Sequence, residues 1–180
     1  FSLLYGFTGT MSITGVVEAL STNGIEPIVL VAMVLCLAGF GYKMALVPFH
    51  LWAPDTYQGA PAPVSGFLAG ITKKGAFVVA FKIFLVTLVA IKKDVSILLG
   101  IIAALTMTVG NIVALMQKNV KRMMAYSSVA HAGNILVGLA IFTQMSNAGA
   151  MLHIIAHGLM TVGAFYANGL AAMIWSISPV

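Results

Sequence analysis

Four lysines lie inside long apolar runs of this 180-residue sequence. Lys43 falls about two thirds of the way along one run, and Lys73, Lys74 and Lys82 fall in the next. A lysine at the centre of a bilayer costs roughly 2.5–3.5 kcal/mol, so such residues are expected to face other helices or a water-filled cavity. Because burial disfavours the ammonium form, a lysine there can gain and lose a proton near neutral pH. An arginine would stay charged. Such lysines therefore predict a proton relay, and Lys43, Lys73 and Lys82 are its candidates.

Snorkelling is the alternative for each of these lysines, because a long stem can return the charge to water from near a helix end. Lys43 and Lys73 lie far from the ends of their runs, which favours a role in proton transfer over snorkelling. Lys82 fits either interpretation. Lys74 points about 100° away from Lys73 on a helix, so both cannot address one narrow cavity equally well.

Pro48 interrupts the same apolar run as Lys43. Proline has no backbone N–H, so a helix through it would leave the carbonyl of Met44 without its donor. At membrane depth such a break is tolerated only where protein or water satisfies the backbone. We expect a proline-broken helix with a polar, hydrated spot beside Lys43. An ordinary proline kink is the alternative.

Three histidines lie within later apolar runs and could carry a proton onward, since the unperturbed imidazole titrates near pH 6.5. His131 lies roughly 13 Å into its run at helical rise. His153 and His157 are four residues apart and share one helix face. Hydrogen-bonded packing is the alternative for all three. The His153–His157 spacing also suits zinc, but the usual third ligand is lacking, so we expect no metal site.

The composition is that of a membrane protein, with 61% hydrophobic and 7% charged residues, whereas soluble domains carry about 25% charge. A water-soluble globular enzyme is therefore excluded. The net charge of +5 is spread thinly, which argues against nucleic-acid binding. A bilayer-crossing helix needs roughly 20 apolar residues. After an opening partial helix, the sequence then predicts five full spans, at residues 27–52, 64–91, 95–116, 122–142 and 148–175.

These spans predict an all-α, polytopic transmembrane helix bundle in which residues 1–180 form a single transmembrane domain. The chain begins with Phe1 and ends abruptly, so we interpret it as a piece of a longer membrane protein. All four acidic residues fall in or beside loops. A buried lysine usually has a counter-charge nearby, and we expect that carboxylate elsewhere in the longer protein.

Two long segments carry a family resemblance. The first is GFGYKMALVPFHLWAPDTYQGAPAPVSGFLAGITKK and the second is NVKRMMAYSSVAHAGNILVGLA. Both resemble the antiporter-like, proton-translocating membrane subunits of respiratory complex I, most of all the N-type (subunit 2-like) member. That type occurs in NADH:quinone and in archaeal deazaflavin-dependent dehydrogenase complexes. The resemblance runs along essentially the whole chain, and it implies the middle part of a fold of about fourteen helices.

The resemblance also implies roles for individual residues. Lys43 matches the lysine on the family's broken helix, and Lys73 matches the lysine on the helix after it. Lys82 stands where relatives often carry arginine, and His131 matches a frequent histidine. In HIIAHGLMT, Thr161 replaces a lysine of some relatives, and the two histidines favour a methanogen-type complex over a bacterial one.

The implied function is proton translocation through buried lysines, coupled to electron transfer to a quinone-type acceptor in partner subunits. The chain would then be a non-catalytic, proton-pumping subunit of a redox-driven translocase. It would hold no cofactor itself, and flavin and iron–sulfur clusters are expected in partner subunits. Its expected surroundings are the other membrane subunits and the lipid bilayer of a prokaryotic cell membrane, which it crosses several times.

Two alternatives remain open at this point. The first is a subunit of a multi-subunit cation/proton antiporter without redox activity. The second is a structural membrane fragment that packs helices and no longer transports.

Overall fold

The computed structural model describes residues 1–23, 26–87 and 92–177, and every regular element in those ranges is a helix. This confirms the expected all-α fold. In chain order the elements are α1 (Ser2–Thr8), α2 (Ile13–Asn23), α3 (Pro27–Met44), α4 (Trp52–Gly59), α5 (Ala62–Phe67), the π-helix η1 (Leu68–Thr72), α6 (Lys73–Thr87), α7 (Lys92–Leu115), α8 (Val120–Ile141) and α9 (Gln144–Ile177).

Four described helices are each long and apolar enough to cross a membrane alone. They correspond to four of the five expected spans and lie at Pro27–Met44, Val95–Leu115, Val120–Ile141 and Gln144–Ile174. The opening partial helix is a bent pair, Ser2–Thr8 and Ile13–Thr22, whose axes differ by 57°.

The remaining expected span, 64–91, is built from three consecutive pieces. Elements α5, η1 and α6 follow one another without a gap from residue 62 to residue 87, which together is long enough to cross a bilayer. The expected end at residue 91 lies outside the described residues. A π-turn ends directly before Lys73, whose N–H donates to the carbonyl of Leu68. Such turns are frequent at functional sites, because they shift the direction of the side chains that follow.

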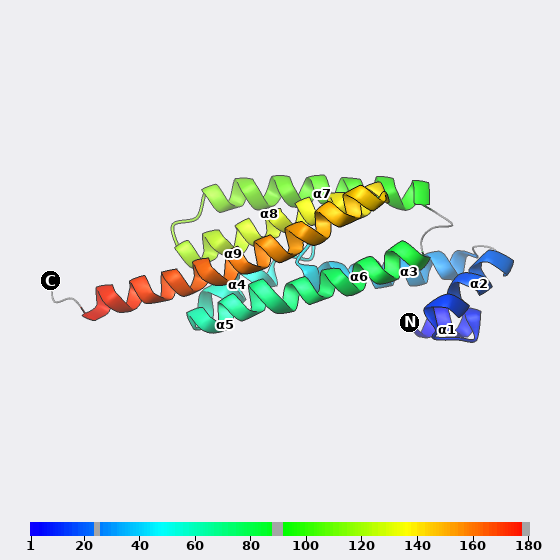
Figure 1. Cartoon of the computed structure of the whole chain (residues 1–180), viewed down its shortest axis with the longest axis horizontal. Helices are drawn as coiled ribbons and strands as arrows, with labels where there is room; N and C mark the ends of the chain where they lie inside the picture. The colour runs from blue at the N-terminus through cyan, green and yellow to red at the C-terminus, as the bar shows by residue number, and fades with distance from the viewer. Residues whose placement is uncertain (24–25, 88–91, 178–180) are drawn as a thin grey trace.

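The helices run nearly side by side, with α8 lying between α7 and α9 (Figure 1). Elements α5 and η1 pack on α9, and α3 packs on α6. The main core lies where α6, α7, α8 and α9 meet, and it contains Phe77, Phe81, Leu99, Ile135 and Leu139. The last part of α9 extends beyond the bundle at the end opposite to α1 and α2 (Figure 1).

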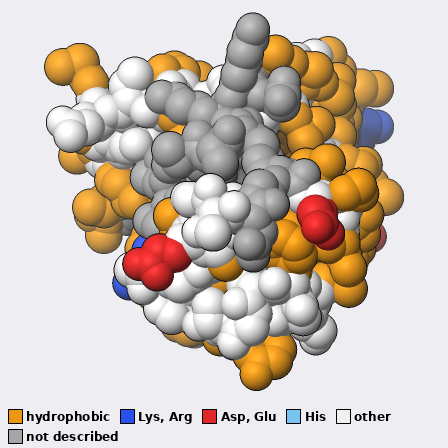
Figure 2. All heavy atoms as spheres, turned by 90° about the vertical axis from the view of Figure 1, so that its right-hand side faces the viewer, with side chains coloured by type: hydrophobic (Ala, Val, Ile, Leu, Met, Phe, Trp, Pro, Cys, Tyr) orange, Lys and Arg blue, Asp and Glu red, His pale blue; other side chains and the backbone are white. Residues whose placement is uncertain are grey.

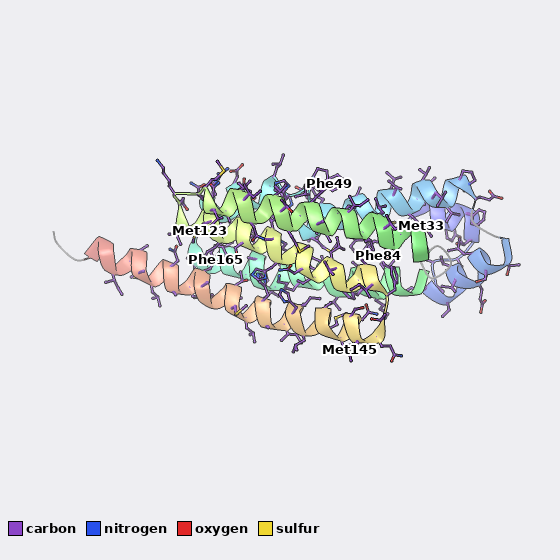
Figure 3. The ribbon with its side chains drawn as sticks, turned by 90° about the horizontal axis from the view of Figure 1, so that it is seen from above. Met33, Phe49, Phe84, Met123, Met145 and Phe165 are labelled. Atoms are coloured by element: carbon purple, nitrogen blue, oxygen red, sulfur yellow. The ribbon has the colours of Figure 1, made fainter. Side chains whose placement is uncertain are left out.

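Small residues let the helices approach closely, as is common in membrane bundles. A Cβ atom added at Gly110 of α7 would lie 2.6 Å from the backbone nitrogen of Ala130 in α8. Gly66, in the segment before Lys73, lies against Phe165 of α9. Phe165 is fully buried, whereas Met145 near the start of the same helix is 86% exposed, and Figure 3 shows the two on opposite sides of α9.

The helix is broken where Pro48 predicted it. Helix α3 ends at Met44, Ala45 adopts a left-handed conformation (φ 55°), and α4 begins at Trp52. Side chains satisfy part of the freed backbone: Val47 N–H donates to Thr106 Oγ1 at 3.1 Å, and Trp52 Nε1 donates to the carbonyl of Tyr42 at 2.8 Å. Protein groups therefore stabilise this break.

The outer surface keeps many large apolar side chains exposed, which is typical of a surface that contacts lipid or other apolar helices. Examples on α9 are Leu152 and Leu159, which are 69% and 72% exposed. Figure 2 shows hydrophobic side chains around the rim of one end of the molecule, with a few charged ones among them.

Candidate functional site

Lys73 lies at the start of α6, directly after the π-turn, and only 1% of it is exposed. Its Nζ donates to the carbonyl oxygen of Ser128 at 2.9 Å and to the Ser128 hydroxyl at 3.2 Å. Ser128 lies on α8, so the contact joins two helices inside the bundle. Both acceptors are neutral, so they hold the amine in place without neutralising its charge.

Lys74 is buried as well, with 5% of it exposed. Its Nζ has no hydrogen-bond partner among the described residues and lies 6.0 Å from the centre of the Phe77 ring. Its stem runs beside α9, because a Cβ atom added at Gly158 would lie 3.7 Å from Lys74 Cγ. The two lysines therefore diverge, as the rotation of about 100° per residue predicts, toward α8 and α9.

The three histidines selected from the sequence come together between α8 and α9. The ring of His131 lies 4.2 Å from that of His157 and 5.2 Å from that of His153, measured between ring centres. His131 Nδ1 and His153 Nε2 are 3.1 Å apart, which is hydrogen-bond distance. His157 is buried, and its Nδ1 lies 3.2 Å from the Thr161 hydroxyl. We call His131, His153 and His157 the histidine cluster.

A cavity of about 210 Å³ that is open to the surface of this chain adjoins the histidine cluster. Its polar lining comes from Ser127, His131, His157 and Thr161, and its apolar lining from Met124, Met160 and Ala164. Since a water molecule occupies about 30 Å³ of liquid volume, the cavity has room for several waters beside the imidazoles. Among the residues that the structure describes, no three His, Cys, Asp or Glu side chains are arranged to hold a metal ion.

The two lysines and the histidine cluster are electrostatically connected. Lys74 acts on all three histidines, and Lys73 acts on His131 and His157. These groups are all basic. In the described part of the chain the carboxylates of Glu18, Glu26 and Asp55 are exposed, and Asp55 pairs with Arg122 at 2.6 Å. The Asp94 side chain lies outside the described residues. The site is therefore a group of amines and imidazoles without a buried carboxylate in this part of the chain.

Lys43 and Lys82 lie elsewhere. Lys43 occupies the last turn of α3, is exposed on this chain, and lines a groove of about 290 Å³ together with Leu35, Cys36 and Phe40. Lys82, on α6, is also exposed. The structure thus brings Lys73 together with the histidines and keeps Lys43 and Lys82 at the surface of the chain.

Sequence reasoning missed two members of the site. Lys74 was set aside for its angle to Lys73, although its position in the middle of an apolar run was itself a signal. His50 was not selected either: it is 7% exposed, its ring centre lies 6.3 Å from that of Tyr126, and Lys73 acts on it electrostatically. Its position two residues after Pro48, in the broken segment, was the available signal.

The chain is similar to known proteins in both sequence and structure. Residues 1–174 match the family described as NADH:quinone oxidoreductase/Mrp antiporter, TM. The F(420)H(2) dehydrogenase subunit N of Methanosarcina mazei is 48% identical over 177 residues, which are 98% of this chain and 36% of that protein. The chain therefore spans about a third of the length of this relative.

Two solved structures have the same arrangement of helices. The Mrp complex from a Dietzia species contains a chain that superimposes with a TM-score of 0.86 at 26% identity, over 93% of this chain and 31% of that one. Respiratory complex I from Thermus thermophilus contains another with a TM-score of 0.73 at 36% identity, over 93% of this chain and 35% of that one.

Proposed function

Because this chain belongs to the NADH:quinone oxidoreductase/Mrp antiporter membrane family, we propose that it moves protons across the membrane as part of a complex I-like redox enzyme. In this proposal residues 1–180 form one transmembrane domain within a longer subunit. The relative with 48% identity is named as a subunit of a dehydrogenase, which supports the redox assignment.

The observation that carries the proposal is the burial of Lys73. An ionisable group inside a membrane protein is costly and is retained mainly for function. Lys73 is 1% exposed and is held by the carbonyl and hydroxyl oxygens of Ser128 rather than by a carboxylate. An amine with neutral partners can release its proton without leaving a bare counter-charge behind.

The proposed route has Lys43 and Lys73 as its amines and the histidine cluster as its continuation. In the first step the proton passes from Lys43 to Lys73 across the broken segment. His50 lies in that segment, within electrostatic reach of Lys73. From Lys73 the proton passes toward His131, and His153 and His157 act as further carriers. The cavity beside His131 and His157 supports this step, because it has room for water. Lys82, exposed on α6, is assigned to a step at the surface of this chain.

The chemistry of electron transfer belongs to partner subunits in this proposal. Flavin and iron–sulfur clusters, and the site of the quinone-type acceptor, lie in those partners. This chain contributes proton movement and contacts with neighbouring membrane subunits and lipid. The complex resides in a prokaryotic cell membrane.

The test uses the complete complex, purified and reconstituted into liposomes, with a pH-sensitive dye inside. We expect Lys73→Met to preserve assembly and to lower the number of protons moved per electron. Removing a side chain that transfers protons typically costs about 10²–10⁴-fold in the rate of that step. Lys118→Met, in the exposed loop before α8, is the matched control and should behave like the unmodified complex. An unchanged proton yield in Lys73→Met would eliminate Lys73 as a relay.

A cation/proton antiporter subunit without redox activity is the second candidate, and the TM-score of 0.86 to a chain of an Mrp complex favours it. The absorption spectrum of the purified native complex decides between the two. Flavin and iron–sulfur bands support the redox enzyme. A complex without these bands that exchanges Na⁺ or another cation for protons supports the antiporter.

A further inference from the structure

We propose that Lys74 is a second proton-carrying amine, which joins Lys73 to the histidine cluster. This inference rests on the proposed function and names a residue of the route that neither the sequence pattern nor the family match selected. It assigns a role to the buried amine that has no hydrogen-bond partner among the described residues.

The first argument is the position of Lys74 inside the bundle. The side chain is 5% exposed, although lysine is almost never buried to this degree without a partner. Its Nζ faces the Phe77 ring at 6.0 Å, a weak contact that does not replace the hydration of an ammonium group. An ordinary structural lysine would instead extend its stem to water or to a carboxylate.

The second argument is the close contact between η1 and α9, which covers the stem of Lys74. A Cβ atom added at Gly70 would meet the side chain of Val162 and would lie 3.0 Å from the carbonyl oxygen of Gly158. The same Gly158 leaves room for the stem of Lys74. The backbones of η1 and α9 therefore approach closely beside the stem of Lys74.

The third argument is the direction in which Lys74 lies. Gly158 directly follows His157 in α9, so the stem of Lys74 lies beside α9 one residue from the histidine cluster. Lys74 acts electrostatically on all three histidines and also on Lys73. Lys73 itself is turned to Ser128 on α8. Of the two buried lysines, Lys74 is therefore the one beside α9.

The charges of the group favour sharing of a proton. Among the described residues, the titratable groups on which Lys74 acts electrostatically are all basic: Lys73 on its own helical segment, His131 on α8, and His153 and His157 on α9. Two neighbouring ammonium groups repel each other in a low dielectric, so a proton bound to one amine lowers the affinity of the other amine for a proton.

The transfer step balances without any further reactant. An N–H bond breaks at Lys73 Nζ and one forms at Lys74 Nζ, through water between the two diverging side chains. The next transfer breaks an N–H bond at Lys74 and forms one at a ring nitrogen of the histidine cluster. No electron moves, and one positive charge travels with the proton.

The test compares two substitutions in the complete complex in liposomes. Lys74→Met removes the amine and keeps an unbranched apolar stem. Lys74→Arg keeps both a long stem and the positive charge, but a guanidinium does not release its proton at physiological pH. We expect both variants to assemble and to lower the rate of proton transport at least about tenfold, since loss of a proton-transferring group typically costs more than that. Lys118→Met serves as the control, and assembly is checked by the yield and size of the purified complex.

The possible results separate this inference from the proposed function. Normal transport by Lys74→Arg means that a fixed charge suffices and overturns the inference. Normal transport by Lys74→Met overturns it too, while loss of transport in Lys73→Met leaves the proposed function standing. Normal transport by Lys73→Met contradicts the proposed function instead. If Lys74→Met does not assemble, the transport rate of the arginine variant decides.

Discussion

The Nζ atom of Lys73 lies 2.9 Å from the carbonyl oxygen of Ser128, which is 55 residues further along the chain. This contact connects the segment after the π-turn to α8. It also fixes the amine at a defined point in the bundle, one residue before the second buried lysine. The position of the candidate relay therefore depends on how α6 packs on α8.

Ser128→Ala tests what the serine hydroxyl contributes to this contact. The substitution removes the contact of 3.2 Å and keeps the carbonyl contact of 2.9 Å. A hydrogen bond typically contributes about 0.5–1.5 kcal/mol, so we expect a small fall in stability and a smaller loss of proton transport than in Lys73→Met. Proton uptake by the complete complex in liposomes measures this. Transport lost as fully as in Lys73→Met would show that the hydroxyl, rather than the carbonyl, holds the amine.

Thr106→Val should weaken the broken segment. The buried Thr106 hydroxyl accepts a hydrogen bond from Val47 N–H at 3.1 Å, and valine has nearly the same shape without that acceptor. An unpaired buried donor costs about 1–3 kcal/mol. The midpoint of thermal unfolding of the complete subunit should fall.

Thr108→Val is the matched control for this experiment, because Thr108 lies on the same helix with an exposed side chain. It should change the midpoint little. An equal fall in both variants would mean that the loss comes from valine in the helix and not from the contact with Val47.

Gly110→Ala should separate α7 from α8. The added Cβ atom would lie 2.6 Å from Ala130 N and 2.8 Å from Ala130 Cα, and a backbone cannot move aside as a side chain can. Overpacking of this kind costs about 1–3 kcal/mol. Thermal unfolding of the complete subunit in detergent should begin at a lower temperature.

Gly100→Ala on the same helix should raise the thermal stability of the subunit instead of lowering it. Nothing lies within 4 Å of a Cβ atom added there, and alanine favours a helix over glycine by roughly 0.5–1 kcal/mol. A stabilised Gly110→Ala variant would contradict the packing of α7 on α8 described above.

Much of the fold could be predicted because apolar runs and breaking residues are local signals. The run ending at Met44 and the following Pro48 predict a broken helix, and α3 ends at Met44. The π-turn at Leu68–Thr72 had no such signal, because it is an i→i+5 hydrogen-bond pattern in an apolar stretch that equally suits an α-helix.

The candidate site was predicted less completely. His131, His153 and His157 were selected one by one, and their common cluster depends on α8 and α9 packing face to face. Lys74 was not selected, although its charge acts on His157 more strongly than the charge of Lys73 does.

The sequence by itself determined that this chain is a bundle of membrane helices with lysines and histidines inside apolar runs, because hydropathy and residue spacing measure position along a helix. Only the tertiary structure decided which of those groups are enclosed. Burial depends on the direction a helix turns toward its neighbours, and that direction follows from side-chain packing between segments far apart in the chain. For this reason Lys73 and Lys74 are buried here, while Lys82 in the same apolar run and Lys43 in an equally apolar one are exposed on the chain.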